Sequence, residues 1–233
     1  LYYIYTGMTI IMIILLLAGR MPVFDALTTA FGTAGTGGFG IKNDSFGSYS
    51  TYLQGVVTVF MILFGINFNA YFLLLTRKFK QLFKIEEIRV YLGVIAVFTT
   101  LIAFNVRGCF GSLRESFHHS LFQVASIITT TGFSTVDFNQ WPAFSKLLLV
   151  LLMFIGACAG STGGGMKCSR ILLLFKGVKK EMMSLIHPRL VRVHKMDGQR
   201  VQHEVMRSVN AFLVAYLIVI VTSILIVSLH CED

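Results

Sequence analysis

The sequence predicts an all-α membrane protein. Of its 233 residues, 55% are hydrophobic and 13% are charged, proportions that ordinary soluble domains do not reach. The mean hydropathy is +0.74, and long apolar stretches follow one another along the chain. The basic residues, which give a formal net charge of +9, lie between those stretches. A soluble enzyme, a disordered tail and a nucleic-acid-binding domain all fit these figures poorly.

Five segments are apolar and long enough to cross the hydrocarbon core of a bilayer. A spanning helix needs about 20 such residues, and about 17 is the low end of the range. The segment 90–106 lies at that low end, but it contains no charge and is flanked by Arg89 and Arg107. The predicted spans are 1–19, 52–76, 90–106, 144–176 and 206–229.

The Lys and Arg residues predict the orientation, since positively charged connections stay in the cytoplasm. The connections around 77–89 and 167–207 contain 15 of the 20 basic residues. The odd-numbered spans are therefore expected to run outward and the even-numbered spans inward. This pattern predicts a multi-pass protein of the cytoplasmic membrane with two basic cytosolic loops, 77–89 and 177–205, that suit contact with anionic lipid.

Two outer segments, 22–50 and 114–143, fit neither a span nor an ordinary loop. Each starts with a short apolar stretch compatible with a helix, continues through a Thr/Gly-rich turn and returns by a polar run. Apolar stretches of about 10 to 14 residues are too short to cross a bilayer and are expected to be re-entrant. The sequence therefore predicts pore half-helices at 23–35 and 115–128.

An internal repeat relates these two segments. A shift of 94 residues aligns them without a gap and pairs Arg20 with Arg114, Leu27 with Leu121, Thr36 with Thr130, Gly38 with Gly132, Phe39 with Phe133 and Phe60 with Phe154. The repeated unit is helix, pore loop, helix, with an N-terminal copy at 1–76 and a C-terminal copy at 90–176. The segment 206–229 is predicted to start a further unit, and we expect the chain to be a piece of a longer protein.

The turns of both copies have the pattern T-x-G-F-small. They consist of Thr36, Gly37, Gly38, Phe39 and Gly40 in the N-terminal copy and of Thr130, Thr131, Gly132, Phe133 and Ser134 in the C-terminal copy. A short extended strand can aim successive carbonyls at an axis and replace the water shell of a cation. Glycine at the third place permits a positive φ, and the preceding half-helix can point the negative end of its dipole at the axis. We therefore predict two segments of a cation selectivity filter, 36–40 and 130–134.

A purely structural interpretation competes with this prediction, because membrane proteins often use glycine for close helix packing or a tight turn. For one motif alone that interpretation is favoured, since short glycine patterns recur by chance. Two copies in register, each preceded by a half-helix, favour the filter. Phe39 and Phe133 are expected to be packing wedges that hold the strands.

The span 144–176 contains a glycine-rich stretch that should interrupt the helix. Each interior glycine costs roughly 1 kcal/mol relative to alanine. Unwound backbone is tolerated in a bilayer where it is buried in protein or lines a water-filled cavity, so this stretch is predicted to face the pore. Its residues include Gly156, Gly160, Ser161, Thr162, Gly163, Gly164, Gly165 and Lys167. The Lys167 ammonium is expected either to extend to the membrane interface or to pair with an element of this loop.

The same stretch is similar to a nucleotide-binding P-loop, but the match fails. Gly160, Gly165 and Lys167 have nearly the required spacing. A P-loop needs glycine, lysine and a hydroxyl residue in succession after a β-strand. Here Met166 intervenes, Cys168 replaces the hydroxyl, and no strand is predicted before the loop.

The remaining reactive side chains form no recognisable site. The four cysteines lie far apart, and His118 and His119 have no third ligand nearby, so neither a disulfide framework nor a metal site is predicted. No nucleophile, base and orienting acid can be assembled on one side of the membrane. We therefore expect a protein that is not an enzyme and holds no cofactor.

The chain resembles the Trk/Ktr/HKT superfamily of potassium transporters, and within it the bacterial TrkH-type group. The resemblance covers essentially the whole chain. It is most specific in SLFQVASIITTTGFSTVDFNQWP (120–142) and FIGACAGSTGGGMKCSRILLLFKG (154–177), which are similar to the pore loop and the broken helix of the family's third repeat. Residues 23–50 are similar to the second repeat's pore loop, and 206–229 to the first helix of the fourth repeat.

The resemblance implies four such repeats in one polypeptide around a pseudo-fourfold cation pore. It implies potassium uptake, with the loop from Gly156 to Lys167 as a gate beneath the filter. It also implies a homodimer and a cytosolic, nucleotide-binding regulatory subunit. The potassium positions that it implies are Thr36, Gly37, Gly38, Thr130, Thr131 and Gly132. These residues fit a channel and an ion-coupled symporter equally. The alternative function is that of a membrane anchor or assembly subunit that transports no ions.

Overall fold

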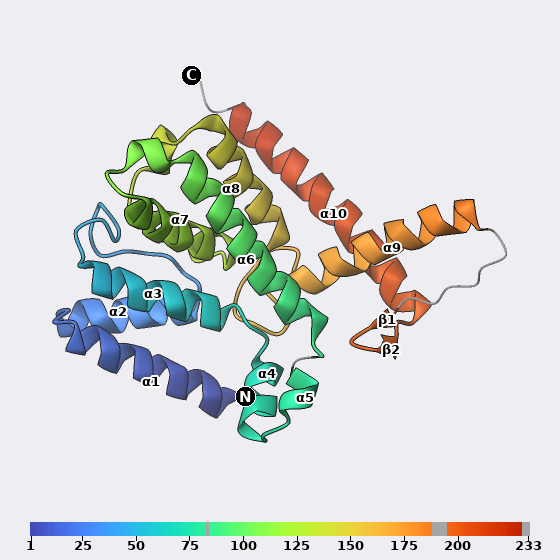
Figure 1. Ribbon diagram of the computed structural model, residues 1–233, viewed down its shortest axis with the longest axis horizontal. Coiled ribbons are helices and arrows are strands. Elements are labelled where there is room, and N and C mark those ends of the chain that lie inside the picture. Colours follow the sequence, from blue (N-terminus) through green and yellow to red (C-terminus); the bar gives the residue numbers. More distant parts are fainter. Residues whose placement is uncertain (83, 188–194, 230–233) are drawn as a thin grey trace. The chain divides into compact units, whose positions relative to one another are not determined.

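The computed structural model describes residues 1–82, 84–187 and 195–229 (Figure 1). The chain divides into two compact units, Leu1–Cys168 and Ser169–Asp233. Within the described residues, the regular structure is helical except for a two-stranded antiparallel hairpin of β1 (Lys195–Met196) and β2 (Gln199–Arg200). The predicted all-α class is therefore confirmed.

The first unit contains eight of the α-helices that the structure describes, and their order follows the predicted repeat. They are α1 (Tyr2–Ala18), α2 (Val23–Ala34), α3 (Thr51–Phe64), α4 (Phe68–Leu75), α5 (Phe79–Leu82), α6 (Glu86–Asn105), α7 (Leu113–Ile128) and α8 (Ala143–Ile155). Two short 3-10 helices lie before and after α7, η1 (Arg107–Cys109) and η2 (Phe138–Gln140).

The first unit is built from two groups of three helices. In the first group, α1, α2 and α3 pack against one another, and in the second α6, α7 and α8 do so (Figure 1). Burial of apolar side chains drives both groups together. The first core includes Met12, Leu16, Met61 and Phe64, and the second includes Ile102, Ile128, Leu149 and Leu152. A contact between α3 and α7 joins the groups and brings the two half-helix segments into one body.

Continuous helices of spanning length are fewer than the five that the sequence predicts. Among the described residues, α6 and α10 (His203–Ser228) are long and apolar enough to cross a membrane. The helices α3 and α4 form a further span only as a pair bent by 91°. The apolar helices α1 and α8 have 17 and 13 residues. The second and fourth predicted spans are thus interrupted rather than continuous.

The prediction of one helix over 52–76 is wrong. Helix α3 ends at Phe64, residues 65–67 leave the helical path, and α4 starts at Phe68. The Asn67 side chain accepts a hydrogen bond of 2.9 Å from the Asn69 N–H and caps α4. Apolar composition could not reveal this break, because its backbone groups pair with a segment far away in sequence, described below.

Helix α6 starts at Glu86, earlier than the predicted helix 90–106. Glu86 and Glu87 lie in its first turn, where the positive end of the helix dipole favours acidic side chains. The predicted cytosolic loop 77–89 therefore also contains α5 and the first turn of α6. The length of the apolar segment does not predict this first turn, because Glu86 and Glu87 lower the local hydropathy without ending the helix.

The second unit has a small core of its own. Helix α9 (Cys168–Ile186) and α10 share three apolar side chains, those of Leu173, Met206 and Val209. The Arg170 guanidinium lies 4.1 Å from the centroid of the Phe212 ring, a cation–π distance. The predicted cytosolic loop 177–205 contains the rest of α9 and the hairpin, and its residues 188–194 lie outside the described residues.

Candidate functional site

The two predicted filter segments have the same backbone conformation. Gly38 and Gly132 have positive φ values of 69° and 95°, as the sequence predicts for the third place of the motif. Thr36 and Thr130, at the first place, also have positive φ values, 52° and 56°. Positive φ is uncommon for threonine, whose branched side chain opposes it. The internal repeat is therefore present in the backbone as well as in the sequence.

The filter segments lie side by side with their backbones in contact. A Cβ atom added to Gly38 would overlap the carbonyl oxygen of Thr131. A Cβ atom added to Gly132 would lie 3.9 Å from the Gly38 Cα. Residues 94 positions apart in the sequence are thus adjacent in space, and the backbones of the two segments meet at one place.

Helix α7 holds the C-terminal filter segment through side-chain hydrogen bonds. The Ser126 hydroxyl donates to the Phe133 carbonyl oxygen at 2.6 Å and accepts from the Gly132 N–H at 3.1 Å. The hydroxyl oxygens of Thr129 and Thr131 lie 2.8 Å apart. These bonds fix the strand to the end of the half-helix that precedes it.

The two phenylalanines of the motif differ in environment. Phe133 is fully buried, and its ring centroid lies 4.8 Å from that of Phe46, which follows the N-terminal filter segment. This agrees with the predicted packing wedge. Phe39 is 88% exposed, so the same prediction is wrong for Phe39. The reason is positional, because Phe133 packs against the preceding copy, whereas no described segment occupies the corresponding place beside Phe39.

The outer end of the C-terminal filter segment is bound to the loop that follows the N-terminal filter segment. The Ser134 N–H donates to the Ser45 hydroxyl at 3.2 Å, and the Phe46 N–H donates to the Ser134 carbonyl oxygen at 2.8 Å. A side chain and a backbone group of the N-terminal copy thus satisfy the backbone N–H and carbonyl of Ser134 in the C-terminal copy. The two copies are joined here by hydrogen bonds and do not fold as independent units.

Two histidines of α7 border this outer region. His119 Nδ1 lies 2.8 Å from the Thr135 hydroxyl, and His118 Nε2 lies 2.8 Å from the Gln54 side-chain oxygen. Burial is the main cause that lowers the pKa of both imidazoles below the ordinary value. Over residues 1–82, 84–187 and 195–229, no three His, Cys, Asp or Glu side chains are placed to hold a metal ion.

The predicted interruption of span 144–176 is present. Helix α8 ends at Ile155, Gly156 follows with a φ of 71°, and α9 starts at Cys168. The ends of the non-helical segment are joined, since the Cys168 N–H donates to the Ala157 carbonyl oxygen at 2.9 Å. We call residues 156–167 the gate loop, after the role that the sequence predicts for them.

The gate loop is hydrogen-bonded to both filter segments at equivalent residues. The Thr36 hydroxyl donates to the Thr162 carbonyl oxygen at 3.2 Å, and the Gly164 N–H donates to the Thr130 hydroxyl at 2.7 Å. Thr36 and Thr130 occupy the first place of their motifs. The loop therefore lies directly against the same end of both segments.

The beginning of the gate loop pairs with the break in the second span. The Cys158 N–H donates to the Gly65 carbonyl oxygen at 3.0 Å, and the Phe68 N–H donates to the Gly160 carbonyl oxygen at 3.1 Å. A side chain attached at Gly65 would collide with the Tyr91 hydroxyl. Two interrupted spans thus satisfy each other's backbone groups, which is how unwound backbone is tolerated within a membrane.

Lys167 turns back into its own loop. Its ammonium donates a hydrogen bond to the Gly163 carbonyl oxygen. Of the two expectations for this side chain, the structure supports pairing with an element of the loop. The bond joins the end of the loop to the part that lies against the filter segments.

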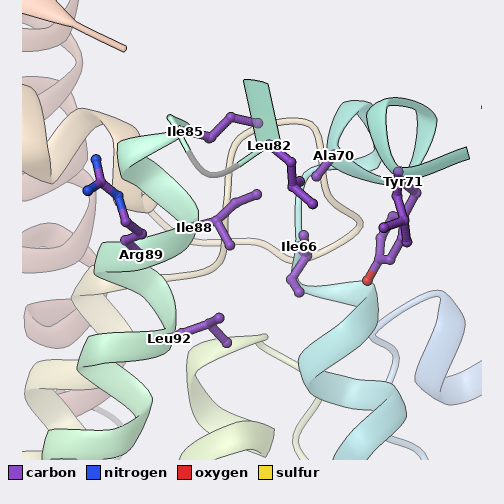
Figure 2. A pocket seen from close by; sticks show the side chains of 9 residues that line it. Ile66, Ala70, Tyr71, Leu82, Ile85, Ile88, Arg89 and Leu92 are labelled. Atoms are coloured by element: carbon purple, nitrogen blue, oxygen red, sulfur yellow. The ribbon is translucent and has the colours of Figure 1, made fainter. Parts of the chain in front are cut away.

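An apolar cavity of about 280 Å³ lies beside the break (Figure 2). Ile66 lines it from the break, and Ile88 and Leu92 line it from α6, with Arg89 at its edge (Figure 2). The cavity belongs to the first unit. The sequence alone assigns no role to the residues of this region, because they belong to predicted spans and to a predicted basic loop.

Comparison with known proteins identifies the family. The sequence profile of the TrkH family, described as cation transport protein, matches residues 1–232. The chain belongs to this family. The predicted TrkH-type resemblance of the chain is thereby confirmed.

Individual relatives in the TrkH family agree with this assignment. The chain is 35% identical over 230 residues to the Trk system potassium uptake protein TrkH of Salmonella typhimurium, covering 97% of this chain and 47% of that protein. It is 37% identical over 218 residues to the Trk system potassium uptake protein TrkG of Escherichia coli, covering 91% and 44%. The chain spans about half the length of the curated relatives that it matches.

A solved structure confirms the fold. The crystal structure of the potassium transporter TrkH from Vibrio parahaemolyticus matches this chain with a TM-score of 0.90 and 33% identity. The match covers 96% of this chain and 49% of that chain. Together with the apolar helices, membership of the TrkH family confirms the predicted location in the cytoplasmic membrane.

Proposed function

We propose that the protein takes up potassium ions across the cytoplasmic membrane, with the described filter segments as part of its ion pathway. The relatives named as potassium uptake proteins and the structural match support this proposal. The observation that carries it is the contact of the gate loop with the first threonine of both filter segments. A loop in that place can obstruct any path that runs between the segments.

The filter chemistry would be dehydration by backbone carbonyls. Strands with their backbones in contact concentrate carbonyl oxygens that can replace the water shell of a cation. The proposed potassium positions are Thr36, Gly37, Gly38, Thr130, Thr131 and Gly132. Phe39, Gly40, Phe133 and Ser134 complete the strands, and potassium is the transported substrate rather than a resident cofactor.

The gate loop would act as a separate obstruction below the filter. Its contacts with Thr36 and Thr130 are two hydrogen bonds, each worth about 0.5–1.5 kcal/mol, so a conformational change can break them. Its residues Gly156, Gly160, Ser161, Thr162, Gly163, Gly164, Gly165 and Lys167 are the proposed gate residues. Ion preference and gating would then depend on different parts of the molecule.

The proposed assembly is a homodimer with a cytosolic, nucleotide-binding regulatory subunit. The relatives' description as parts of a Trk system supports a complex with other components. The proposed contact is the basic segment 177–205, whose Lys and Arg residues predict a cytosolic location. In this function the protein is a transporter and not an enzyme.

Flux measurement on the complete protein in proteoliposomes tests the proposal. Deleting residues 162–165 removes the part of the loop that lies against the filter segments, so potassium flux should rise while the preference for potassium over sodium stays near wild type. An intact dimer whose flux is no higher than wild type would contradict the gate. A membrane anchor or assembly subunit instead predicts no potassium flux from the wild-type protein.

A further inference from the structure

A buried carboxylate lies against the gate loop. Glu87, in the first turn of α6, is 3% exposed, and its Oε1 accepts a hydrogen bond of 2.6 Å from the Ala159 N–H. Burial of a carboxylate is costly unless strong hydrogen bonds compensate for the lost water. A charge-assisted bond of this length is such a compensation. The side chain therefore has a specific task in the fold, beyond the general preference for acids at a helix start.

The Glu87 bond reaches the part of the loop that pairs with the second span. Ala159 lies between Cys158 and Gly160, whose backbone groups bond to Gly65 and Phe68. Those neighbouring bonds are between backbone groups. The bond to Glu87 uses a side chain of a third element, α6, and so ties the loop to a helix that is continuous for 20 residues.

The opposite part of the loop has a weaker hold. There the loop is bonded to other elements through Thr36 at 3.2 Å, Thr130 at 2.7 Å and the Thr162 hydroxyl, which donates to the Phe64 carbonyl oxygen at 3.3 Å, and all three bonds join neutral groups. The Lys167 bond to Gly163 lies within the loop and ties it to no other element. Hydrogen bonds to charged groups contribute about 1.5–3 kcal/mol, against about 0.5–1.5 kcal/mol for neutral pairs. The Glu87 end is therefore the anchored end, and the filter end is the one that can release first.

We propose that Glu87 is a positioning residue of the gate, whose carboxylate anchors the loop at Ala159 and so sets the place of residues 162–164 against the filter. This inference rests on the proposed function of the loop as a gate. Without the Glu87 bond, the position of the loop relative to α6 would no longer be fixed. Its hydrogen bonds with Thr36 and Thr130 would then weaken together.

The surroundings of α6 suit such an anchor. Tyr91, one helical turn after Glu87, is fully buried and donates to the Ile62 carbonyl oxygen at 3.2 Å, so the same face of α6 holds both the loop and the end of α3. The neighbouring face, with Ile88 and Leu92, borders the apolar cavity (Figure 2). The polar contacts of Glu87 and Tyr91 thus join the gate loop and the end of α3 to one face of α6.

Three substitutions separate the reach of the side chain from its charge. Glu87→Gln keeps an oxygen at the same distance and removes the charge, whereas Glu87→Asp keeps the charge and withdraws it by one methylene. Glu87→Ala removes both. Glu86→Ala, one position earlier in the same turn, is the matched control for effects of an acid at the helix start.

Cysteine labelling reports the loop position directly. Cys158 and Cys168 lie within and at the end of the loop and are fully buried. In the complete protein in proteoliposomes, with all other cysteines replaced by serine, a water-soluble maleimide should label these thiols slowly. Glu87→Ala and Glu87→Asp should raise the labelling rate by roughly tenfold, the factor expected for loss of one charge-assisted bond. Glu87→Gln keeps a neutral hydrogen bond in place of the charge-assisted one, so its labelling rate should rise less than that of Glu87→Asp. Glu86→Ala should stay within about twofold of the parent.

Potassium flux is measured on the same samples. Faster labelling with raised flux supports both the anchor and the gate. Faster labelling with unchanged flux supports the anchor and overturns the gate, so the two failures are distinguishable. Parent-like labelling of Glu87→Asp in folded protein overturns the anchor, as does acceleration in Glu87→Gln equal to that in Glu87→Asp. The conservative Asp and Gln variants keep the test decisive if Glu87→Ala does not fold.

Discussion

The two filter segments share a backbone conformation but differ in what supports it. In the C-terminal copy the Ser126 side chain bonds to the strand, whereas Gly32 occupies the aligned position of the N-terminal copy. The backbone bond at this position is the same in both copies. The Thr131 N–H donates to the Ser126 carbonyl oxygen at 2.9 Å, and the Gly37 N–H donates to the Gly32 carbonyl oxygen at 2.7 Å.

The absence of a side chain at Gly32 makes room for a residue of the C-terminal copy. A Cβ atom there would lie 3.4 Å from the tip of the Phe133 ring, so the glycine leaves space for the neighbour's wedge. The local motif thus sets the backbone conformation of each filter segment, while the neighbouring copy supplies the side chains that pack against it. Packing from the neighbouring copy therefore stabilises each filter segment. Phe39 is exposed because no described segment packs against that side of the N-terminal filter segment.

The largest expected effect separates the two third-place glycines. Gly38→Ala places a methyl group onto the Thr131 carbonyl and should abolish assembly of the filter, whereas Gly132→Ala meets its first neighbour at 3.9 Å. Both variants also incur the cost of a positive φ, about 1–2 kcal/mol. Gly132→Ala should therefore fold and lose part of its preference for potassium over sodium. Yield of folded complete protein and competitive flux of the two ions measure this, and equal yields of the variants would contradict the close approach.

The next effect concerns the two phenylalanines. Phe133→Ala should destabilise the protein by about 3–5 kcal/mol, because a large ring is removed from a fully buried site. Phe39→Ala should cost less than about 0.5 kcal/mol, as expected for an exposed position. Denaturant unfolding of the complete protein measures both values. A cost for Phe39→Ala as large as that for Phe133→Ala would show that a segment outside the described residues covers Phe39.

Local chemistry made part of this structure predictable from the sequence. The T-x-G-F pattern predicted the positive φ of Gly38 and Gly132, because a glycine's conformational freedom is a property of the residue itself. The gate loop was predictable for a similar reason, since five glycines within ten residues weaken any helix.

Features that depend on distant partners were not predictable. The break at 65–67 exists because the backbone of residues 158–160 pairs with it. The sequence of the second span is mostly apolar and contains two Gly and two Asn, which do not by themselves end a helix there. In the sequence, Glu87 is one more charged residue of the predicted basic loop 77–89. Its task depends on the Ala159 N–H, which lies 72 residues away in the sequence.

The smallest expected effect is a pH dependence confined to the C-terminal copy. Its outer contacts use His118 and His119, whereas the aligned positions of the N-terminal copy are Phe24 and Asp25. Asp25 accepts a 2.7 Å bond from the Tyr49 hydroxyl, and burial together with this bond raises the pKa of Tyr49 above its ordinary value of about 10. The Tyr49 donor therefore keeps its proton throughout the physiological range.

The imidazoles behave in the opposite way. Burial lowers the pKa of both, with Arg114 adding to the effect at His118 and His118 adding to it at His119, while Glu115 acts against it at His119. A lowered pKa in the fold means that the neutral ring is the stable form. Its contribution to stability is complete above the ordinary pKa of about 6.5 and is lost as the pH falls through the lower pKa of the folded state.

Between about pH 7.5 and pH 5.5 the melting temperature of the protein should therefore fall by a few degrees. Replacing both histidines by glutamine should flatten this dependence, and Tyr49→Phe, which alters the corresponding contact of the other copy, should leave it unchanged. A pH profile that survives loss of both imidazoles would show that the dependence comes from other groups.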